Sequence, residues 1–394
     1  MFATKASRPA SRCRLLLPHN TRLPRESCIH TCRVKRPTAL TKKDAHKCRY
    51  REMPFAPATI PCHSRSFLTS LPTLLVPPVV FTGLLLALWT YKVFMTVVFQ
   101  EKILYMSYMP PQTRSERIED YAATCKPVQW EEVRIKSLDG TKIALGVGSI
   151  HPQPASKTPT REVVICYFQG NGGSVPPRLP LLSNTLKHLQ SRMGEHVRFT
   201  MVALSYRGYW TSSGRATEPG IKLDAQATLQ WVKDNHPHAS IVLWGQSLGA
   251  GVACAAAEHH LAQDESQPLP GLVLETPFTS VSSMLLALYP EKWLPYRYLS
   301  RFLRSHWDSE VALRRIAEIK ACRRPQVLLI AATRDEIVPS EEAEKLQKVC
   351  EEASLGFKRV NVIGALHNEA TTRREGQEAI AKFVVDQCGD QRLL

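Results

Sequence analysis

The chain has 394 residues, enough for one large or two medium-sized domains. Its formal net charge is +16, but residues 1–73 hold 15 Lys and Arg against three Asp and Glu, a charge of +12 that leaves only +4 for residues 74–394. The remainder is nearly balanced, so a basic nucleic-acid-binding face is not expected. The eleven cysteines follow no metal-ligand or disulfide spacing, and neither a metal nor an organic cofactor is predicted.

The first 73 residues are predicted to be a disordered basic tail. They are rich in Arg, Pro, Ser and Thr and lack apolar periodicity. Their scarcity of acidic residues also suits a mitochondrial presequence, and a translation start assigned upstream of the true one explains the composition equally well.

A transmembrane anchor is predicted over residues 74–100. The run from Ser66 to Tyr91 carries no charge, and its apolar character continues past Lys92 to Phe99. About 20 apolar residues span a bilayer, and Lys92 can snorkel to one interface. A buried amphipathic helix is the alternative. The basic tail places the N-terminus in the cytosol and residues 105–394 on the opposite face, in the endoplasmic reticulum or another endomembrane rather than the mitochondrion.

Residues 105–394 are predicted to form one catalytic domain of α/β class. Residues 131–137 and 143–148 flank an Asp139-Gly140 turn, as in a hairpin. Short apolar strands then alternate with helices, which indicates a mostly parallel sheet covered on both faces. These strands are expected near 163–168, 199–205, 241–244, 272–275, 327–332 and 359–363, and the helices near 177–191, 220–235, 248–262, 340–352 and 371–387. The long connection 276–320 is expected to be a small helical cap.

The most informative motif is Gly245-Gln-Ser-Leu-Gly249, which lies between an apolar strand and a small-residue helix. Glycines on both sides of Ser247 permit a strained turn that exposes the serine hydroxyl. The same turn directs the backbone N–H of Leu248 toward the oxygen of an attacked carbonyl. A glycine-rich turn without catalytic function is the alternative.

Three further strand ends carry candidate groups. Asn171, in the glycine-rich loop after strand 163–168, is the candidate second oxyanion donor. Asp335 follows strand 327–332 and is the candidate acid, with Glu336 as the second choice; an acid at a helix N-terminus is the alternative interpretation. His367 follows the last strand and is the candidate base, although a lone loop histidine is usually only solvated. Serine, acid and histidine in this order, each at a strand end, favour a catalytic triad.

These motifs resemble the α/β-hydrolase fold over residues 110–387, especially the membrane-anchored serine hydrolases that include lysophospholipases and monoacylglycerol lipases. The resemblance implies Ser247 as nucleophile, Asp335 as acid and His367 as base, with an oxyanion hole from the N–H groups of Asn171 and Leu248. The matching segments are Gln169–Gly173, Ser205–Tyr209, Trp244–Gly251, Leu274–Thr279, Arg334–Pro339 and Leu366–Asn368.

One residue departs from the family pattern. Relatives usually carry His-Gly where this chain has Gln169-Gly170, so the oxyanion loop is expected to differ in geometry without loss of catalysis. Arg207 and Glu218 are expected to brace loops rather than to touch substrate.

The predicted function is a membrane-anchored serine hydrolase that cleaves a carboxylic ester of a lipid, a monoacylglycerol or lysophospholipid, through an acyl-enzyme on Ser247. A thioesterase or peptidase would use the same triad, and a catalytically inactive scaffold is the alternative of another class. Trp293 and Tyr296 in the cap are candidates for the substrate pocket, because amphipathic aromatic residues suit a membrane–water interface.

Overall fold

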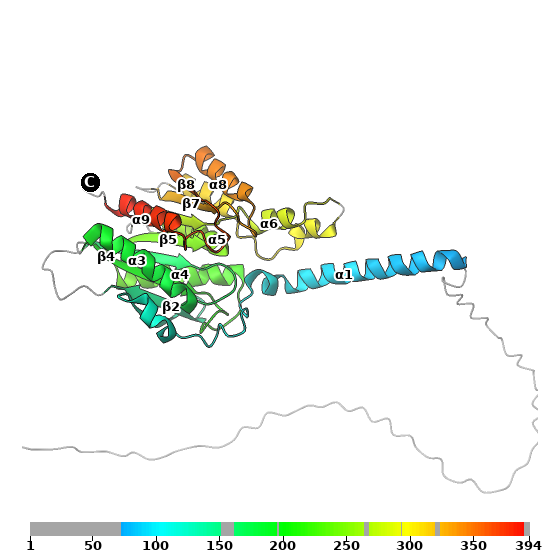
Figure 1. The fold of residues 1–394 in the computed structure, drawn as a ribbon, viewed down its shortest axis with the longest axis horizontal. Coiled ribbons are helices and arrows are strands. Elements are labelled where there is room, and N and C mark those ends of the chain that lie inside the picture. Colours follow the sequence, from blue (N-terminus) through cyan, green and yellow to red (C-terminus); the bar gives the residue numbers. More distant parts are fainter. Residues whose placement is uncertain are drawn as a thin grey trace, which may run out of the picture. The chain divides into compact units, whose positions relative to one another are not determined.

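The computed structural model describes residues 72–150, 161–194, 197–263, 268–292, 294–319 and 324–389 (Figure 1). Apart from its last two residues, the segment predicted to be a disordered tail lies outside the described residues, and so does Trp293. The described part has the predicted α/β architecture, with a mostly parallel sheet and helices on both faces.

Eight strands form one sheet in the order β1-β2-β4-β3-β5-β6-β7-β8. β2 is antiparallel to β1 and β4, and the neighbours from β4 to β8 are parallel. The predicted hairpin is present, and Gly140 in its turn has a φ of +83°, which favours glycine. The strands are β1 (Gln129–Lys136), β2 (Lys142–Ser149), β3 (Arg161–Phe168), β4 (Val197–Ser205), β5 (Ser240–Gln246), β6 (Gly271–Glu275), β7 (Gln326–Ala332) and β8 (Phe357–Val362).

The two faces of the sheet bury separate apolar cores. Along β3, Val164 and Phe168 belong to one core, and Ile165 and Tyr167 to the other, as the two-residue period of a strand requires. On one face α3 contacts α9, and on the other α5 contacts α4 and α7, while α7 contacts α8 (Figure 1). These helices are α3 (Leu179–Met193), α4 (Glu218–Asn235), α5 (Leu248–Gln263), α7 (Ser309–Glu318), α8 (Ser340–Glu352) and α9 (Arg374–Gly389); the short α2 (Ala122–Cys125) precedes β1.

The helix α1 (Val76–Tyr105) is the candidate transmembrane span. Together with the preceding 3-10 turn it forms a 33-residue segment, Thr73–Tyr105, long and apolar enough to cross a membrane, and an 18-residue stretch of it has a mean hydropathy of 1.9. Its apolar side chains are largely exposed, for example Phe81 at 69% and Leu84 at 66%. Two prolines lie at the helix start, where their missing N–H groups cost nothing.

The segment 276–320 contains two different parts. α6 (Val281–Leu288) and the 3-10 segment η6 (Pro295–Phe302) contact each other, and η6 also contacts α1. α7 instead packs against α5 and α8 in the helical layer of the sheet. Buried Glu342 of α8 fixes the start of α6, since its carboxylate accepts hydrogen bonds from the backbone N–H of Thr279 at 2.9 Å and from the Ser283 hydroxyl at 2.5 Å.

Candidate active site

Ser247 lies in a sharp turn between β5 and α5, with a φ of +52°. A side chain at either flanking glycine would collide with backbone. A Cβ on Gly245 would lie 2.1 Å from the carbonyl oxygen of Gly249, and a Cβ on Gly249 would lie 2.0 Å from that of Phe168. Strand, turn and helix therefore approach so closely that only glycine fits, and this holds the Ser247 backbone in the left-handed region.

The candidate acid and base are hydrogen-bonded to each other. His367 Nδ1 lies 2.9 Å from Asp335 Oδ2 and 3.0 Å from Oδ1, and the two side chains are 3% and 6% exposed. Oδ1 also accepts the backbone N–H groups of Ile337 at 2.9 Å and Val338 at 2.7 Å. Because an ionised carboxylate only accepts hydrogen bonds, the pairing selects the tautomer with a proton on Nδ1 and a lone pair on Nε2.

Glu336, the second candidate for the acid, has a different contact. Its Oε2 accepts the backbone N–H of His367 at 3.0 Å, whereas the imidazole ring faces Asp335. Glu336 therefore holds the histidine loop, and Asp335 orients the ring.

The loop after β3 lies over the serine turn. A Cβ on Gly170 would lie 3.6 Å from Ser247 Cβ and 3.5 Å from the carbonyl oxygen of Gln246. Among the described residues, no acceptor takes the backbone N–H of Asn171. Leu248 is the first residue of α5, where a backbone N–H has no intrahelical partner. These two N–H groups are therefore free to serve an oxyanion.

Gly172 and Gly173, the next two residues of this loop, are hydrogen-bonded to the last residue of α1 and to the segment that follows it. Gly172 and Gly173 have φ of +68° and +71°. Their N–H groups donate to the carbonyl oxygens of Tyr105, at 3.0 Å, and Met109, at 2.7 Å. The Tyr105 carbonyl also accepts the hydroxyl of Tyr209. The conformation of the oxyanion loop thus depends on the segment that follows the candidate membrane helix.

The same tyrosine also contacts the segment after η6. The hydroxyl of Tyr105 lies 2.8 Å from the Ser305 hydroxyl and accepts a hydrogen bond from Trp307 Nε1 at 3.1 Å. Tyr105 is only 1% exposed. Nothing in the sequence signalled this role, although the predicted catalytic domain begins at Tyr105.

Gln169 is completely buried at the start of the oxyanion loop. Its backbone carbonyl accepts the hydroxyl of Tyr206 at 2.8 Å, whereas neither polar atom of its side-chain amide has a partner among the described residues. The residue that departs from the family pattern is thus tied to the fold by its main chain only.

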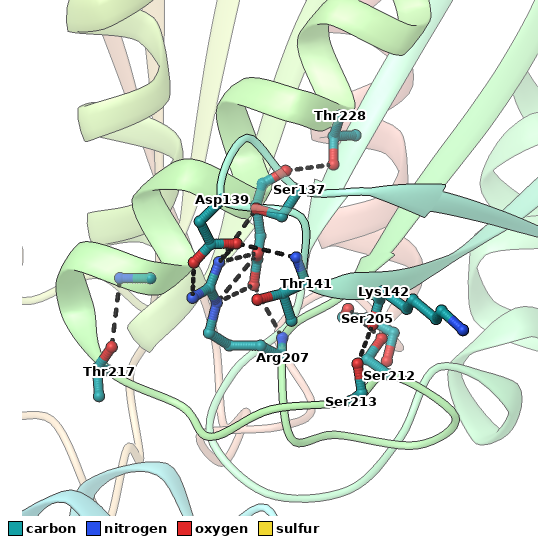
Figure 2. Close-up of polar contacts among 12 residues, drawn as sticks. Ser137, Asp139, Thr141, Lys142, Ser205, Arg207, Ser212, Ser213, Thr217 and Thr228 are labelled. Atoms are coloured by element: carbon teal, nitrogen blue, oxygen red, sulfur yellow. Dashed lines mark hydrogen bonds and ion pairs between the residues drawn. The ribbon is translucent and has the colours of Figure 1, made fainter. Parts of the chain in front are cut away.

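Arg207 braces two loops, as expected from the sequence (Figure 2). Its guanidinium lies 2.8 Å from Asp224 and 2.7 Å from Asp139, and it donates to the Ser137 hydroxyl at 3.1 Å. Asp224 is fully buried, and the hydrogen bond from Arg207 holds the pKa of Asp139 well below its usual range. Glu218 similarly accepts the backbone N–H groups of His306 and Trp307.

We expect Arg207→Met to lower the free energy of unfolding by about 3–5 kcal/mol, since it leaves the buried Asp224 carboxylate without a cation. Asp139→Asn should cost less, because the Asp139 side chain is 38% exposed. The ion pair of Asp139 contributes its full share of the free energy of unfolding above about 3.9, the pKa of an aspartate in the unfolded chain. This contribution is lost as the pH falls through the lowered pKa of Asp139 in the folded state. Urea denaturation at neutral pH and below pH 4 measures both effects. Unchanged stability in Arg207→Met would contradict the bracing role.

An open pocket of about 510 Å³ adjoins the serine turn. Asn171 and His367 line it, together with Gln246 and Arg178, which sequence reasoning did not identify. Gln246 stands next to Ser247 in the motif, but nothing in the sequence marked Arg178. Within the described ranges, no cluster of His, Cys, Asp and Glu could hold a metal ion.

The structure does not bring Tyr296 into this pocket. Tyr296 is 5% exposed, and its ring centroid lies 4.9 Å from that of Tyr289. The Lys92 ammonium of α1 lies 5.0 Å from the centroid of the Tyr296 ring. The expected contact with substrate thus has no support in this geometry, because packing against neighbours buries the ring. Trp293, the other predicted pocket residue, lies outside the described residues.

The chain resembles known proteins in sequence and in fold. A family model for the α/β-hydrolase fold matches residues 163–306. The α/β hydrolase domain-containing protein WAV2 of Arabidopsis thaliana is 30% identical over 253 residues, which cover 62% of this chain and 73% of that protein. A lysophosphatidylserine lipase of Danio rerio, ABHD12, is 30% identical over 187 residues, 46% of either chain.

A solved structure agrees with the fold. The crystal structure of an α/β hydrolase from Vibrio vulnificus superposes with a TM-score of 0.54 at 21% identity, covering 72% of this chain and 92% of that one. The family model and the extent of the match to WAV2 identify the family, and the mostly parallel sheet with a serine turn between β5 and α5 is consistent with its fold. The chain therefore belongs to the α/β-hydrolase family.

Proposed function

We propose that this chain is a membrane-anchored serine hydrolase that cleaves carboxylic esters of a lipid. Ser247 is the nucleophile, His367 the general base, and Asp335 the acid that orients it. The observation that carries the proposal is the 2.9 Å contact between Asp335 and His367 Nδ1, made by loops at the same sheet edge as the Ser247 turn. With its proton on Nδ1, the imidazole presents Nε2 as the acceptor for the serine proton.

The reaction proceeds in two steps. Ser247 Oγ attacks the ester carbonyl carbon while its proton passes to His367 Nε2, and the N–H groups of Asn171 and Leu248 stabilise the resulting oxyanion. The C–O bond to the alcohol then breaks, and His367 protonates the departing oxygen, leaving an acyl-enzyme. Water, deprotonated by His367, attacks this acyl group, and the fatty acid leaves as Ser247 regains its proton.

A lipid substrate, monoacylglycerol or lysophospholipid, is supported by two observations. α1 exposes a long apolar surface that water would not tolerate, so we propose that it crosses a membrane once, in the endoplasmic reticulum or another endomembrane. The relative from Danio rerio is named as a lysophosphatidylserine lipase. The first alternative is a thioesterase or peptidase that uses the same triad. The second is a catalytically inactive scaffold.

A fluorophosphonate probe tests the proposal directly. The full chain in detergent should react covalently and stoichiometrically, because the probe modifies a serine only when a base activates it. Ser247→Ala should block labelling, while Ser191→Ala, a change to an exposed serine of α3, should not. An unlabelled wild-type chain that is folded would favour the inactive scaffold.

A chain that begins at Glu101 tests what the anchor contributes. It retains Tyr105, whose carbonyl supports the oxyanion loop, but loses Gln100, which accepts the N–H of Arg304 at 2.7 Å. We expect it to hydrolyse short soluble esters about as fast as the full chain. On lipid esters in vesicles it should be slower by about 10²-fold, because tethering supplies a high effective concentration.

The matched control fuses an unrelated apolar helix of equal length to Glu101, which should restore hydrolysis in vesicles. Equal loss on both kinds of substrate would mean that the anchor is needed for folding. No loss on either would remove the support that the anchor gives to a lipid substrate.

A further inference from the structure

The candidate active-site pocket contains one permanently charged side chain. Arg178 ends the 3-10 turn Pro176–Arg178 before α3 and lines the pocket with Asn171 and His367. Among the described residues that line this pocket there is no Asp, Glu or Lys. A substrate in the pocket therefore meets a positive potential, to which the free N–H groups of the oxyanion loop add.

The guanidinium of Arg178 has only uncharged hydrogen-bond partners in the described part of the chain. Nη1 donates to Gln246 Oε1 at 2.7 Å and Nη2 to the carbonyl oxygen of Gly172 at 3.5 Å, and both acceptors are uncharged. Nε is buried without any hydrogen-bond partner in the described part of the chain, where Arg178 also forms no ion pair. A guanidinium offers five N–H donors, and the buried Nε–H cannot reach a ligand, so one N–H on Nη1 and one on Nη2 remain available.

The neighbouring acidic groups, Tyr167 and Glu275, have hydrogen-bond partners of their own. Gln246 Oε1 also accepts the hydroxyl of Tyr167 at 3.0 Å, and burial raises the pKa of Tyr167 to about 12, so this hydroxyl remains a neutral donor. Glu275 is fully buried, where the Thr371 hydroxyl at 2.6 Å and Trp244 Nε1 at 3.0 Å satisfy its carboxyl group. Burial raises the pKa of Glu275.

We propose that Arg178 binds an anionic group on the alcohol portion of the substrate. This rests on the proposed function and selects between its two lipids, because a lysophospholipid carries such a group and a monoacylglycerol does not. The guanidinium fork matches two oxygens of a phosphodiester. His367, which lines the same pocket, gives its proton to the departing alcohol, and an anion borne by that alcohol lies on the same side of the reacting bond.

Two esters with the same oleoyl chain test the assignment: monooleoylglycerol and oleoyl lysophosphatidylglycerol. Both are presented to the full-length protein at low mole fraction in the same neutral detergent micelles, so that surface charge and dilution are equal. Arg178→Met should lower kcat/KM for the lysophospholipid by about 10- to 100-fold and change that for monooleoylglycerol by less than about threefold. Arg178→Lys should retain part of the preference. Arg192→Met, at the exposed far end of α3, should change neither value.

A measurement on the unaltered chain guards against a variant that fails to fold. Glycerol 3-phosphate should compete with a short neutral ester for the wild-type site, and glycerol should not. Equal loss on both esters in a folded Arg178→Met protein would overturn the proposal and make Arg178 a support of the oxyanion loop; no loss on either would also overturn it. A wild-type chain that cleaves no ester and takes up no fluorophosphonate would instead remove the proposed function itself.

Discussion

Ser247→Ala is expected to lower kcat for ester hydrolysis by about 10⁶-fold, leaving only the rate that the oxyanion hole and substrate binding supply. The change deletes one hydroxyl from a residue whose position is set by backbone contacts at Gly245 and Gly249. The fold should persist, and the free energy of unfolding should change by less than about 1 kcal/mol. Turnover of a chromogenic ester by the purified full chain measures the effect.

Contamination is the main source of error in that measurement, because a trace of another esterase would determine the residual turnover measured for Ser247→Ala. Ser191→Ala, purified in parallel, supplies the upper reference, and fluorophosphonate titration gives the number of active sites. Residual turnover of Ser247→Ala that scales with protein concentration and stays within tenfold of wild type would show that Ser247 is not the nucleophile.

Asp335→Asn should lower kcat by about 10⁴-fold with little effect on KM. Asparagine can keep one oxygen on the N–H groups of Ile337 and Val338, but its amide then donates to His367 Nδ1. The imidazole proton moves to Nε2, and the base is lost although the geometry remains. Steady-state kinetics on a soluble ester would separate this loss of turnover from weaker binding.

Glu336→Gln is the matched variant, since a glutamine oxygen can still accept the backbone N–H of His367. We expect it to cost less than about tenfold in kcat, because no charged partner of the imidazole is removed. The reverse ranking, with Glu336→Gln damaging and Asp335→Asn mild, would reassign the acid by one position.

The strand ends that carry the candidate triad were predictable because buried parallel strands are continuous apolar runs that stop at glycine or polar residues. The predicted strand 327–332 corresponds to β7 (Gln326–Ala332), and 241–244 lies inside β5 (Ser240–Gln246). Asp335 and His367 come after β7 and β8, so pattern and chain order were enough to expect them at one edge of the sheet.

The surroundings of the site were not predictable in the same way. Arg178 and Gln246 are 68 positions apart, and the hydroxyls of Tyr105 and Ser305 are contributed by residues 200 positions apart. No local pattern encodes such contacts. Tyr296 does not line the pocket, and composition identifies an amphipathic aromatic residue but not the neighbours that bury it. The predicted anchor, 74–100, ends with the apolar run, whereas the helix α1 continues to Tyr105.

If α1 anchors the chain in a membrane as proposed, the hydrogen bond between the Tyr105 carbonyl and the oxyanion loop bears on release of the domain by proteolysis. The segment between α1 and the body of the domain is accessible, with Tyr108 54% and Met109 47% exposed, and so it is a natural site for a protease. A cut after Met106 would break the covalent link between the domain and Tyr105, whose carbonyl holds Gly172. We expect a domain released at this point to hydrolyse esters more slowly than the full chain, so the proposed activity would remain largely with the anchored form.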